Sequence, residues 1–117
     1  MDILGLRDQP PHSFLAQGIF LGESNGIKNW ALTRSQALNA LSQLMATGWP
    51  ILGGDIIQHA GGNSFTYTYE NWHCEMQHDE QSEDFLARSI QVARSHILHL
   101  DDVSKFVVLV PSDKNVR

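Results

Sequence analysis

Two adjacent glycines and an aspartate, Gly53-Gly54-Asp55, interrupt a segment that is otherwise typical of a β-strand, from Ile51 to His59. Glycine loses more conformational freedom on ordering than other residues and packs no side chain, so a strand interior rarely contains it without a reason. The backbone must bulge there, adopt a positive φ, or let another group approach closely. Asp55 is then either a surface carboxylate that meets a partner or a structural residue that accepts backbone N–H groups of the bulge.

The residues after this segment predict a β-hairpin and one more strand. Residues 60–63, Ala-Gly-Gly-Asn, supply a tight turn, and residues 64–70 alternate in polarity. The alternation places three aromatic side chains on one face: Phe65, Tyr67 and Tyr69. Residues 105–110 are apolar and rich in β-branched valine, so we expect them to add a strand to the hairpin.

A first helix is predicted to begin at Thr33. Thr33 and Gln36 fit a capping box, in which each side chain bonds the backbone N–H of the other residue. Gly48 is expected to end the helix. Its apolar stripe at helical spacing comprises Leu38, Leu41 and Met45, flanked by Ala37 and Leu44.

A second helix is predicted from Ser82, which is expected to cap it. Glu83 and Asp84 fall in its first turn, where the helix dipole favours carboxylates, and Asp84 is expected to pair with Arg88. Its apolar stripe comprises Leu86, Ile90, Ala93, Ile97 and Leu100.

Neither helix can bury its stripe alone, and an isolated hairpin is marginally stable in water. We therefore expect an α+β fold in which both helices pack on one face of a small antiparallel sheet made of the hairpin plus the C-terminal strand. Residues 1–117 are expected to form a single domain, with residues 1–13 as a loose N-terminal arm. Residues 14–21 suit a helix or a strand equally well, and residues 23–26 predict a turn.

The charge of the chain is negative and unevenly placed. The formal net charge is −5, and the stretch from Ser35 to Ala87 has no Lys or Arg. Six carboxylates of this stretch gather around the second helix start and are the candidates for partner binding: Glu70, Glu75, Asp79, Glu80, Glu83 and Asp84. Such a field repels nucleic acid and attracts a basic protein surface. The alternative is a solvated loop followed by a helix start that carboxylates stabilise.

The sequence has few features that are typical of a catalytic site or a metal site. His73, Cys74 and His78 have a spacing that could ligate zinc, with Glu75, Asp79 or His59 as a fourth ligand, although structural zinc sites are usually richer in cysteine. A metal-binding protein or a metal-dependent enzyme is therefore the alternative function. No nucleophile triad or phosphate-binding loop is recognisable, so we expect no enzyme and no cofactor. A single cysteine, no signal-like N-terminus and no long apolar run predict a cytoplasmic protein that does not contact a membrane.

Five segments occur in a characteristic order: Gly26-Ile27-Lys28-Asn29-Trp30-Ala31-Leu32, Gln36-Ala37-Leu38, Ile51-Leu52-Gly53-Gly54-Asp55, Asn71-Trp72, and the helix from Ser82 to Leu100. In this order they resemble the immunity protein 40 family of bacterial polymorphic toxin systems. The resemblance implies a small cytoplasmic protein that binds and neutralises a cognate toxin, without catalysis. We expect it to act by occlusion, with an acidic, aromatic-containing surface covering the active or substrate-binding face of the toxin. It places five residues in family motifs: Gly53, Gly54, Asp55, Asn71 and Trp72. Trp72 can serve as an interface anchor or as a core residue, and we favour the core.

Overall fold

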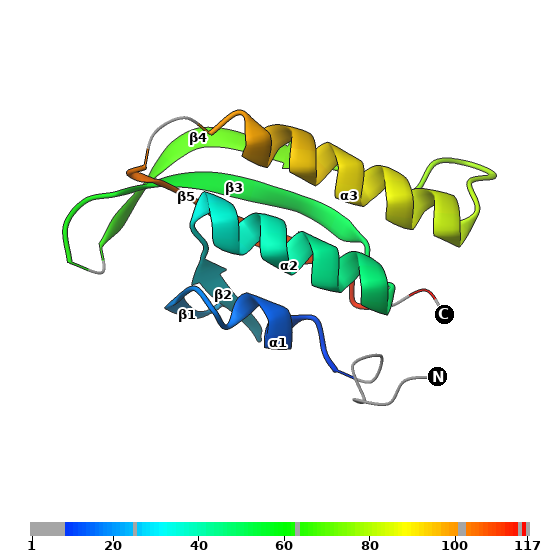
Figure 1. Ribbon diagram of the computed structural model, residues 1–117, viewed down its shortest axis with the longest axis horizontal. Helices are drawn as coiled ribbons and strands as arrows, with labels where there is room; N and C mark the ends of the chain where they lie inside the picture. Colours follow the sequence, from blue (N-terminus) through cyan, green and yellow to red (C-terminus); the bar gives the residue numbers. More distant parts are fainter. Residues whose placement is uncertain (1–8, 25, 63, 101–102, 115, 117) are drawn as a thin grey trace.

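The computed structural model of the chain describes residues 9–24, 26–62, 64–100, 103–114 and 116. Within them the elements are, in chain order, α1 (His12–Leu15), β1 (Ile19–Ser24), β2 (Ile27–Ala31), α2 (Arg34–Thr47), β3 (Ile51–His59), β4 (Phe65–His73), α3 (Ser82–Leu98) and β5 (Lys105–Pro111). The strands β4, β3 and β5 form one antiparallel sheet in that order, and β1 pairs with β2 in a second one (Figure 1). The predicted α+β fold class is confirmed.

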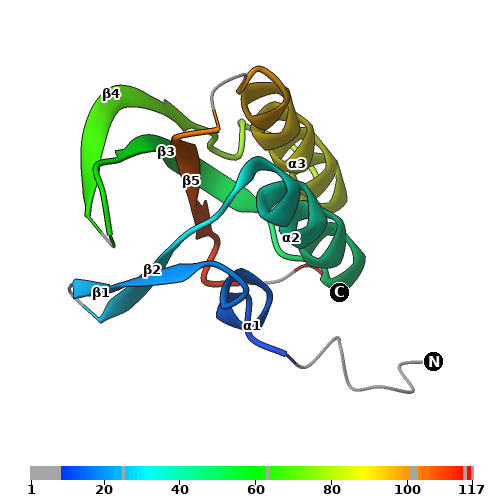
Figure 2. The same ribbon diagram turned by 60° about the vertical axis from the view of Figure 1, so that its left-hand side comes forward.

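The helices α2 and α3 lie side by side on one face of the β4-β3-β5 sheet (Figures 1 and 2). The core between these layers contains side chains from both of them that are fully buried: Leu41, Leu44, Ile51, Ile97 and Val107. The apolar stripe predicted on α3 is confirmed, because all five of its members are buried in this core: Leu86, Ile90, Ala93, Ile97 and Leu100. In the described part of the chain, no helix has both the length and the apolar character needed to cross a membrane.

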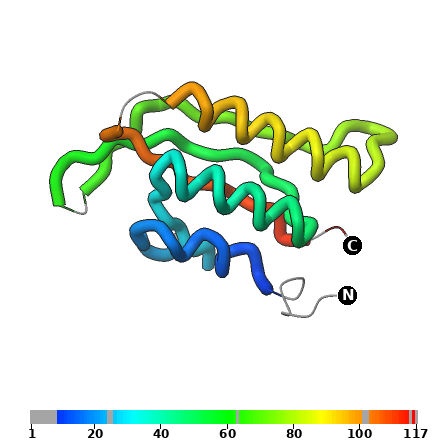
Figure 3. The backbone as a smooth tube through the Cα atoms, viewed as in Figure 1, coloured from blue at the N-terminus to red at the C-terminus, as the bar shows by residue number. Residues whose placement is uncertain are grey.

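The ends of α2 follow the sequence closely. The Thr33 hydroxyl accepts the Gln36 N–H at 3.2 Å, and the Gln36 side-chain oxygen accepts the Thr33 N–H at 3.0 Å, which completes the capping box. Gly48 ends the helix with a φ of 84°, and the chain then reverses into β3 (Figure 3). The predicted stripe was wrong at Met45, which is 40% exposed. The helix turns its alanine-rich side, with Ala37 and Ala40, to the core, because small side chains allow a close approach.

The start of α3 differs from the prediction. Gln81 occupies the N-cap position without a side-chain cap, and Ser82 is the first helical residue. The expected pair of Asp84 and Arg88 is also wrong, because Arg88 bonds Glu80 instead. Glu80 precedes the helix and is held beside it by a folded loop, so Arg88 reaches a carboxylate that helical spacing alone does not indicate.

The strand β4 contains an irregularity that the predicted alternation missed. Ile57 pairs with Tyr67 and Ile56 with Glu70, so Thr68 and Tyr69 are two extra residues on β4. The Thr68 hydroxyl fills the gap by donating to the Ile56 carbonyl at 2.7 Å. Tyr69 has a φ of 66°, which breaks the alternation, and it lies with Trp72 and His96, whereas Tyr67 lies with Asp55 and Ile57. The two tyrosines therefore do not share a face as predicted.

The N-terminal region contains elements that the sequence left undecided. Residues 14–21 contribute to both α1 and β1, separated by a short turn. The helix α1 starts within the segment predicted as a loose arm, and residues 1–8 of that arm lie outside the described residues. The turn predicted at 23–26 is shorter than expected, since β1 runs to Ser24; Asn25 lies outside the described residues. The resulting β1–β2 hairpin was not predicted.

A buried serine ties α3 to the start of β3. The Ser89 side chain is fully buried; its hydroxyl donates to the Leu86 carbonyl and accepts the Ile51 N–H, both at 3.0 Å. Ser89→Ala should therefore lower the free energy of unfolding by about 1–3 kcal/mol, because the Ile51 N–H would be buried without an acceptor. Urea denaturation measures the loss. Ser42→Ala is the matched control: its exposed hydroxyl only bonds its own helix, so stability should change little.

Candidate functional site

The two glycines of β3 make room for the Trp72 ring. A β-carbon on Gly54 would lie 2.7 Å from Cζ2 and 2.8 Å from Cζ3 of Trp72, and one on Gly53 would collide with the Trp72 carbonyl oxygen. Neither glycine has a positive φ. The β3–β4 ladder is regular at both of them, but the β3–β5 ladder has a register shift between Ile51 and Gly53. The structure therefore supports two of the three reasons for this motif: close approach of Trp72 at Gly54, and a bulge of β3 immediately before Gly53.

Trp72 is a core residue. It pairs with Gly54 across the sheet, is 6% exposed, and stacks on His96 of α3 with ring centroids 4.7 Å apart and an angle of 7° between the planes. The ring is thus enclosed between Gly54 of β3, which has no side chain, and His96 of α3. Its Nε1 is buried and has no hydrogen-bond partner among the described residues. The motif containing Gly54 and Trp72 therefore fixes the distance between sheet and helix.

Asp55 points to the opposite face of the sheet. It sits on the central strand, in register with Asn71 of β4 and Val108 of β5. The side chain is half-buried, and within the described residues no hydrogen bond or ion pair engages its carboxylate. The interpretation of Asp55 as an acceptor for bulge N–H groups is therefore not supported, and the surface interpretation remains.

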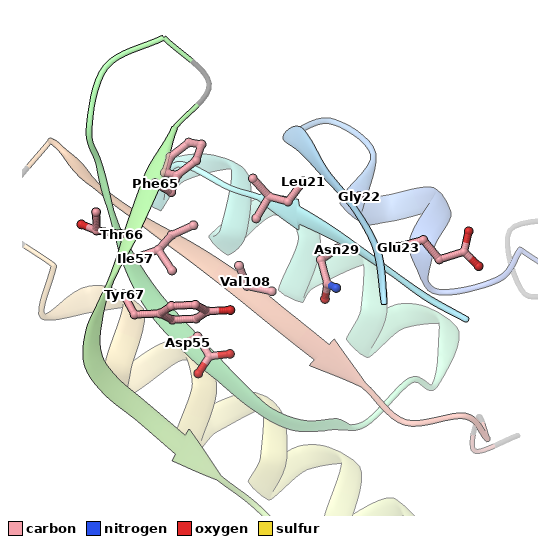
Figure 4. Close-up of a pocket in the computed structure, with 10 residues that line it drawn as sticks. All are labelled: Leu21, Gly22, Glu23, Asn29, Asp55, Ile57, Phe65, Thr66, Tyr67 and Val108. Carbon is pink, nitrogen blue, oxygen red and sulfur yellow. The ribbon is translucent and has the colours of Figure 1, made fainter. Parts of the chain in front are cut away.

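This face of the sheet forms the floor of a groove of about 520 Å³ (Figure 4). The groove exists because Leu32, just after β2, pairs with Val107 of β5 through two backbone hydrogen bonds of 2.8 Å. This bridge carries the β1–β2 hairpin around to face β3 and β4 (Figure 2). Each of the strands contributes to the lining: Leu21, Gly22, Glu23, Asn29, Asp55, Ile57, Phe65, Thr66, Tyr67 and Val108.

The groove is amphipathic. Its floor is apolar, with Ile57 and Val108 buried beneath it, and Tyr67 lies over it with 72% of its surface exposed (Figure 4). Asp55 and Glu23 are its charged members, and none of the described residues that line it is a Lys or Arg. Such a surface suits a ligand that is partly apolar and positively charged.

Three comparisons with known proteins bear on what this arrangement is for. The model of the family described as Immunity protein 40 matches residues 21–111, which include both walls of the groove and the motif with Gly54 and Trp72. The chain belongs to this family. No curated protein and no solved structure matches the chain. The resemblance seen in the sequence is thus confirmed at the level of the family.

Two of the acidic candidates of this Immunity protein 40 family member are engaged within the fold. Arg88 donates from Nε and Nη2 to the two carboxylate oxygens of Glu80, both at 2.8 Å. The same guanidinium also donates to the Glu75 carbonyl at 2.5 Å and to Cys74 Sγ at 3.3 Å. Glu70 accepts from Lys105 at 3.2 Å. The Arg88 contacts thus hold the loop between β4 and α3 against the helix.

The other four acidic candidates are exposed around this loop. They are Glu75, Asp79, Glu83 and Asp84. Asp79 has a φ of 63°, a backbone conformation that Asp and Asn tolerate better than most residues. These four carboxylates lie on the α3 side of the β4 end, and the groove lining does not include them. The acidic loop and the groove are therefore two separate surfaces, of which only the loop was expected from the sequence.

The residues proposed as metal ligands do not form a site. Cys74 is buried and contacts Arg88, whereas His73 and His78 are exposed. Among the described residues, no group of three His, Cys, Asp or Glu side chains is placed to hold a metal ion. The metal-binding alternative therefore has no structural support.

The Glu80–Arg88 contact should make stability depend on pH. The hydrogen bond from Arg88 is the main cause that lowers the pKa of Glu80 from its ordinary 4.5 to about 2, and the Gln77 N–H assists. Because the folded pKa is depressed, the stabilisation is complete above pH 4.5 and is lost as pH falls from 4.5 towards 2. We expect Glu80→Gln to have a lower urea midpoint than wild type at pH 7 and to converge with it near pH 2.5, since about 2.5 is close to the depressed pKa. The urea midpoint of Glu75→Gln should change with pH as that of the wild type does, because its exposed carboxylate lacks such a contact. The same pH dependence of the midpoint in Glu80→Gln, Glu75→Gln and the wild type would contradict the assignment of this pH dependence to the Glu80–Arg88 contact.

Proposed function

We propose that this chain binds a cognate toxin protein and neutralises it by covering its active or substrate-binding face, without chemistry of its own. Membership of the Immunity protein 40 family is the observation that carries the proposal. The exposed aromatic and apolar side chains around the groove support a binding role, because contiguous exposed apolar surface commonly marks interaction sites. We place this activity in the cytoplasm, where such a protein would meet a toxin that has entered or been made in the cell.

The charge of the chain favours a basic toxin. The formal net charge of −5 and the exposed carboxylates of the β4–α3 loop attract a cationic protein and repel nucleic acid and anionic membrane surfaces. Complementary charge mainly accelerates the encounter, and exposed charges add little to folding stability. The acidic loop is therefore proposed as a steering surface for the toxin.

Co-expression tests the proposed function. The protein encoded directly upstream is induced in cells with or without this chain, and growth is followed. We expect the upstream protein to stop growth alone, growth to recover with this chain, and a stable complex to be purified from the recovering cells. A soluble, well-expressed chain that neither restores growth nor forms a complex would contradict the proposal. An unrelated acidic protein expressed at the same level controls for a nonspecific effect of charge.

The steering role predicts salt-dependent association. The variant with Glu75→Lys and Asp79→Asn should associate with the toxin about threefold or more slowly at low salt, and the difference should shrink at higher salt as the Debye length falls to about 8 Å. Asn is chosen for position 79 because it tolerates the positive φ. Stopped-flow or surface-binding kinetics measure the rates, and the melting temperature should hardly change. Asp113→Lys, a charge reversal in the exposed segment after β5, is the control. It changes the net charge by two units, against three for the variant, so slowing in proportion to these charges would show that net charge alone acts.

A further inference from the structure

The carboxylate of Asp55 is unusually placed for a side chain without a partner. It stands at the middle of the sheet, on the strand flanked by β4 and β5, beside the buried apolar side chains of Ile57 and Val108. Within the described residues, nothing neutralises it. A half-buried charge loses hydration and gains nothing in return until a cation or a hydrogen-bond donor arrives.

We propose that the groove receives a basic side chain of the toxin, an arginine or lysine, whose charged end pairs with Asp55. This inference rests on the proposed function, since it assigns the contact surface of the same complex. The methylene stem of such a side chain can lie on the apolar floor formed by Ile57 and Val108 while its head reaches the carboxylate. Asp55 is thus the central contact, and the acidic loop serves the encounter.

Tyr67 adds an aromatic face beside the Asp55 carboxylate. Its ring comes from β4 and lies over the groove beside Asp55, with most of its surface exposed (Figure 4). An aromatic face next to a carboxylate attracts a cation by its quadrupole, and arginine stacks on such faces readily. Tyr67 and Asp55 together therefore select a basic side chain over a neutral apolar one.

The groove is open enough for an inserted side chain. Its volume of about 520 Å³ exceeds that of any single side chain, and it lies between β1 and β4, each of which has its partner strand on one side only. Gly22 on the β1 wall has nothing within 4 Å of where a β-carbon would stand, so this wall leaves free space at its rim. A loop or an extended segment of the toxin can enter from this rim.

Charge complementarity favours a toxin over a second copy of this chain. A second copy also has a formal net charge of −5, so two groove faces would repel each other. The lining residues offer Asp55 and Glu23 without a Lys or Arg among those described, which matches a cationic partner. The occupant is accordingly a basic segment of the toxin.

Two groove variants and two matched controls test this inference against the toxin domain encoded beside this chain. The groove variants are Asp55→Asn, which keeps the shape of the side chain, and Tyr67→Ala. The controls are Asp113→Asn and Tyr69→Ala, which make the same changes at exposed positions outside the groove and outside the acidic loop. We expect each groove variant to weaken the affinity about tenfold or more through faster dissociation, as for central contacts of an interface. The affinity of each control for the toxin domain should remain within about twofold of the wild-type affinity, because exposed charges and contacts at the rim of an interface contribute little.

The outcomes separate this inference from the proposed function. Unchanged melting temperatures show that the groove variants are folded. A tight wild-type complex that both groove variants form equally well would overturn the groove assignment while leaving the proposed function standing. Absence of a wild-type complex would overturn both. A wild-type homodimer that Tyr67→Ala dissociates would assign the groove to a second copy and overturn the inference.

Discussion

The Trp72→Ala variant is expected to lose about 3–5 kcal/mol of unfolding free energy, the range for removing a large aromatic side chain from a core. Trp72 is enclosed between Gly54 of β3 and the His96 ring of α3, so its removal leaves a cavity between sheet and helix. The cavity cannot close easily, because glycine has no side chain to fill it. Urea denaturation followed by circular dichroism measures the loss.

Trp49→Ala provides the control for this prediction. Trp49 is only partly buried, and its Nε1 donates to the Gln9 carbonyl at 3.3 Å near the surface. We expect a distinctly smaller loss for this variant, because less apolar area leaves water when Trp49 folds. An equal loss of unfolding free energy in the two variants would show that Trp72 contributes no more to the core than the partly buried Trp49.

The Gly54→Val variant is expected to lose about 3 kcal/mol, at the upper end of what overpacking usually costs. The valine β-carbon would lie 2.7 Å from Cζ2 of Trp72, and its methyl groups would need the space of the ring itself. Neither partner can yield freely, since Gly54 is in the central strand and the ring is stacked on His96.

A double-mutant cycle isolates the steric cause. In a Trp72→Leu background the smaller side chain frees space, so Gly54→Val should cost at least about 1 kcal/mol less than in the wild type, within the range of coupling between contacting residues. A penalty that is the same in both backgrounds would mean that the backbone of β3, rather than the Trp72 ring, requires glycine.

Sequence reasoning worked best where local chemistry decides the structure. The capping box of Thr33 and Gln36, the end of α2 at Gly48 and the bounds of β3 depend on near neighbours, and the structure has them where they were predicted. The need for glycine at Gly54 was also inferable, because a strand rarely accepts two glycines without close packing. Its partner Trp72 is far along the chain, so the sequence could not say which group approaches.

The missed features depend on contacts between distant residues. The two extra residues of β4, Thr68 and Tyr69, are accommodated because the Thr68 hydroxyl donates to the Ile56 carbonyl. The alternation of polar and apolar residues in the sequence does not indicate this contact. The β1–β2 hairpin depends on the bridge between Leu32 and Val107, which are 75 positions apart by their numbers (107 − 32). Arg88 likewise pairs with Glu80 and not with Asp84, the helical neighbour expected from spacing.

The groove could not be predicted for the same reason. Its contacts Asp55 and Tyr67 were both noted in the sequence, one as part of a motif and one as part of an alternating face. They share a surface with Leu21 only because the hairpin curves around to face the sheet. The acidic loop was visible because its carboxylates are close together in the sequence, yet two of the six candidates are engaged by Arg88 and Lys105.

Neutralisation by occlusion is tested most directly by titrating the purified toxin with this chain and measuring the residual toxin activity. Occlusion requires one bound chain for each inhibited toxin molecule, so activity should fall in proportion to added chain and vanish near one equivalent. Toxin recovered after denaturant separates the complex should be chemically unchanged and regain its activity on refolding. Loss of activity at a small fraction of one equivalent, with a permanently altered toxin, would contradict the account and identify the chain as an enzyme that acts on the toxin.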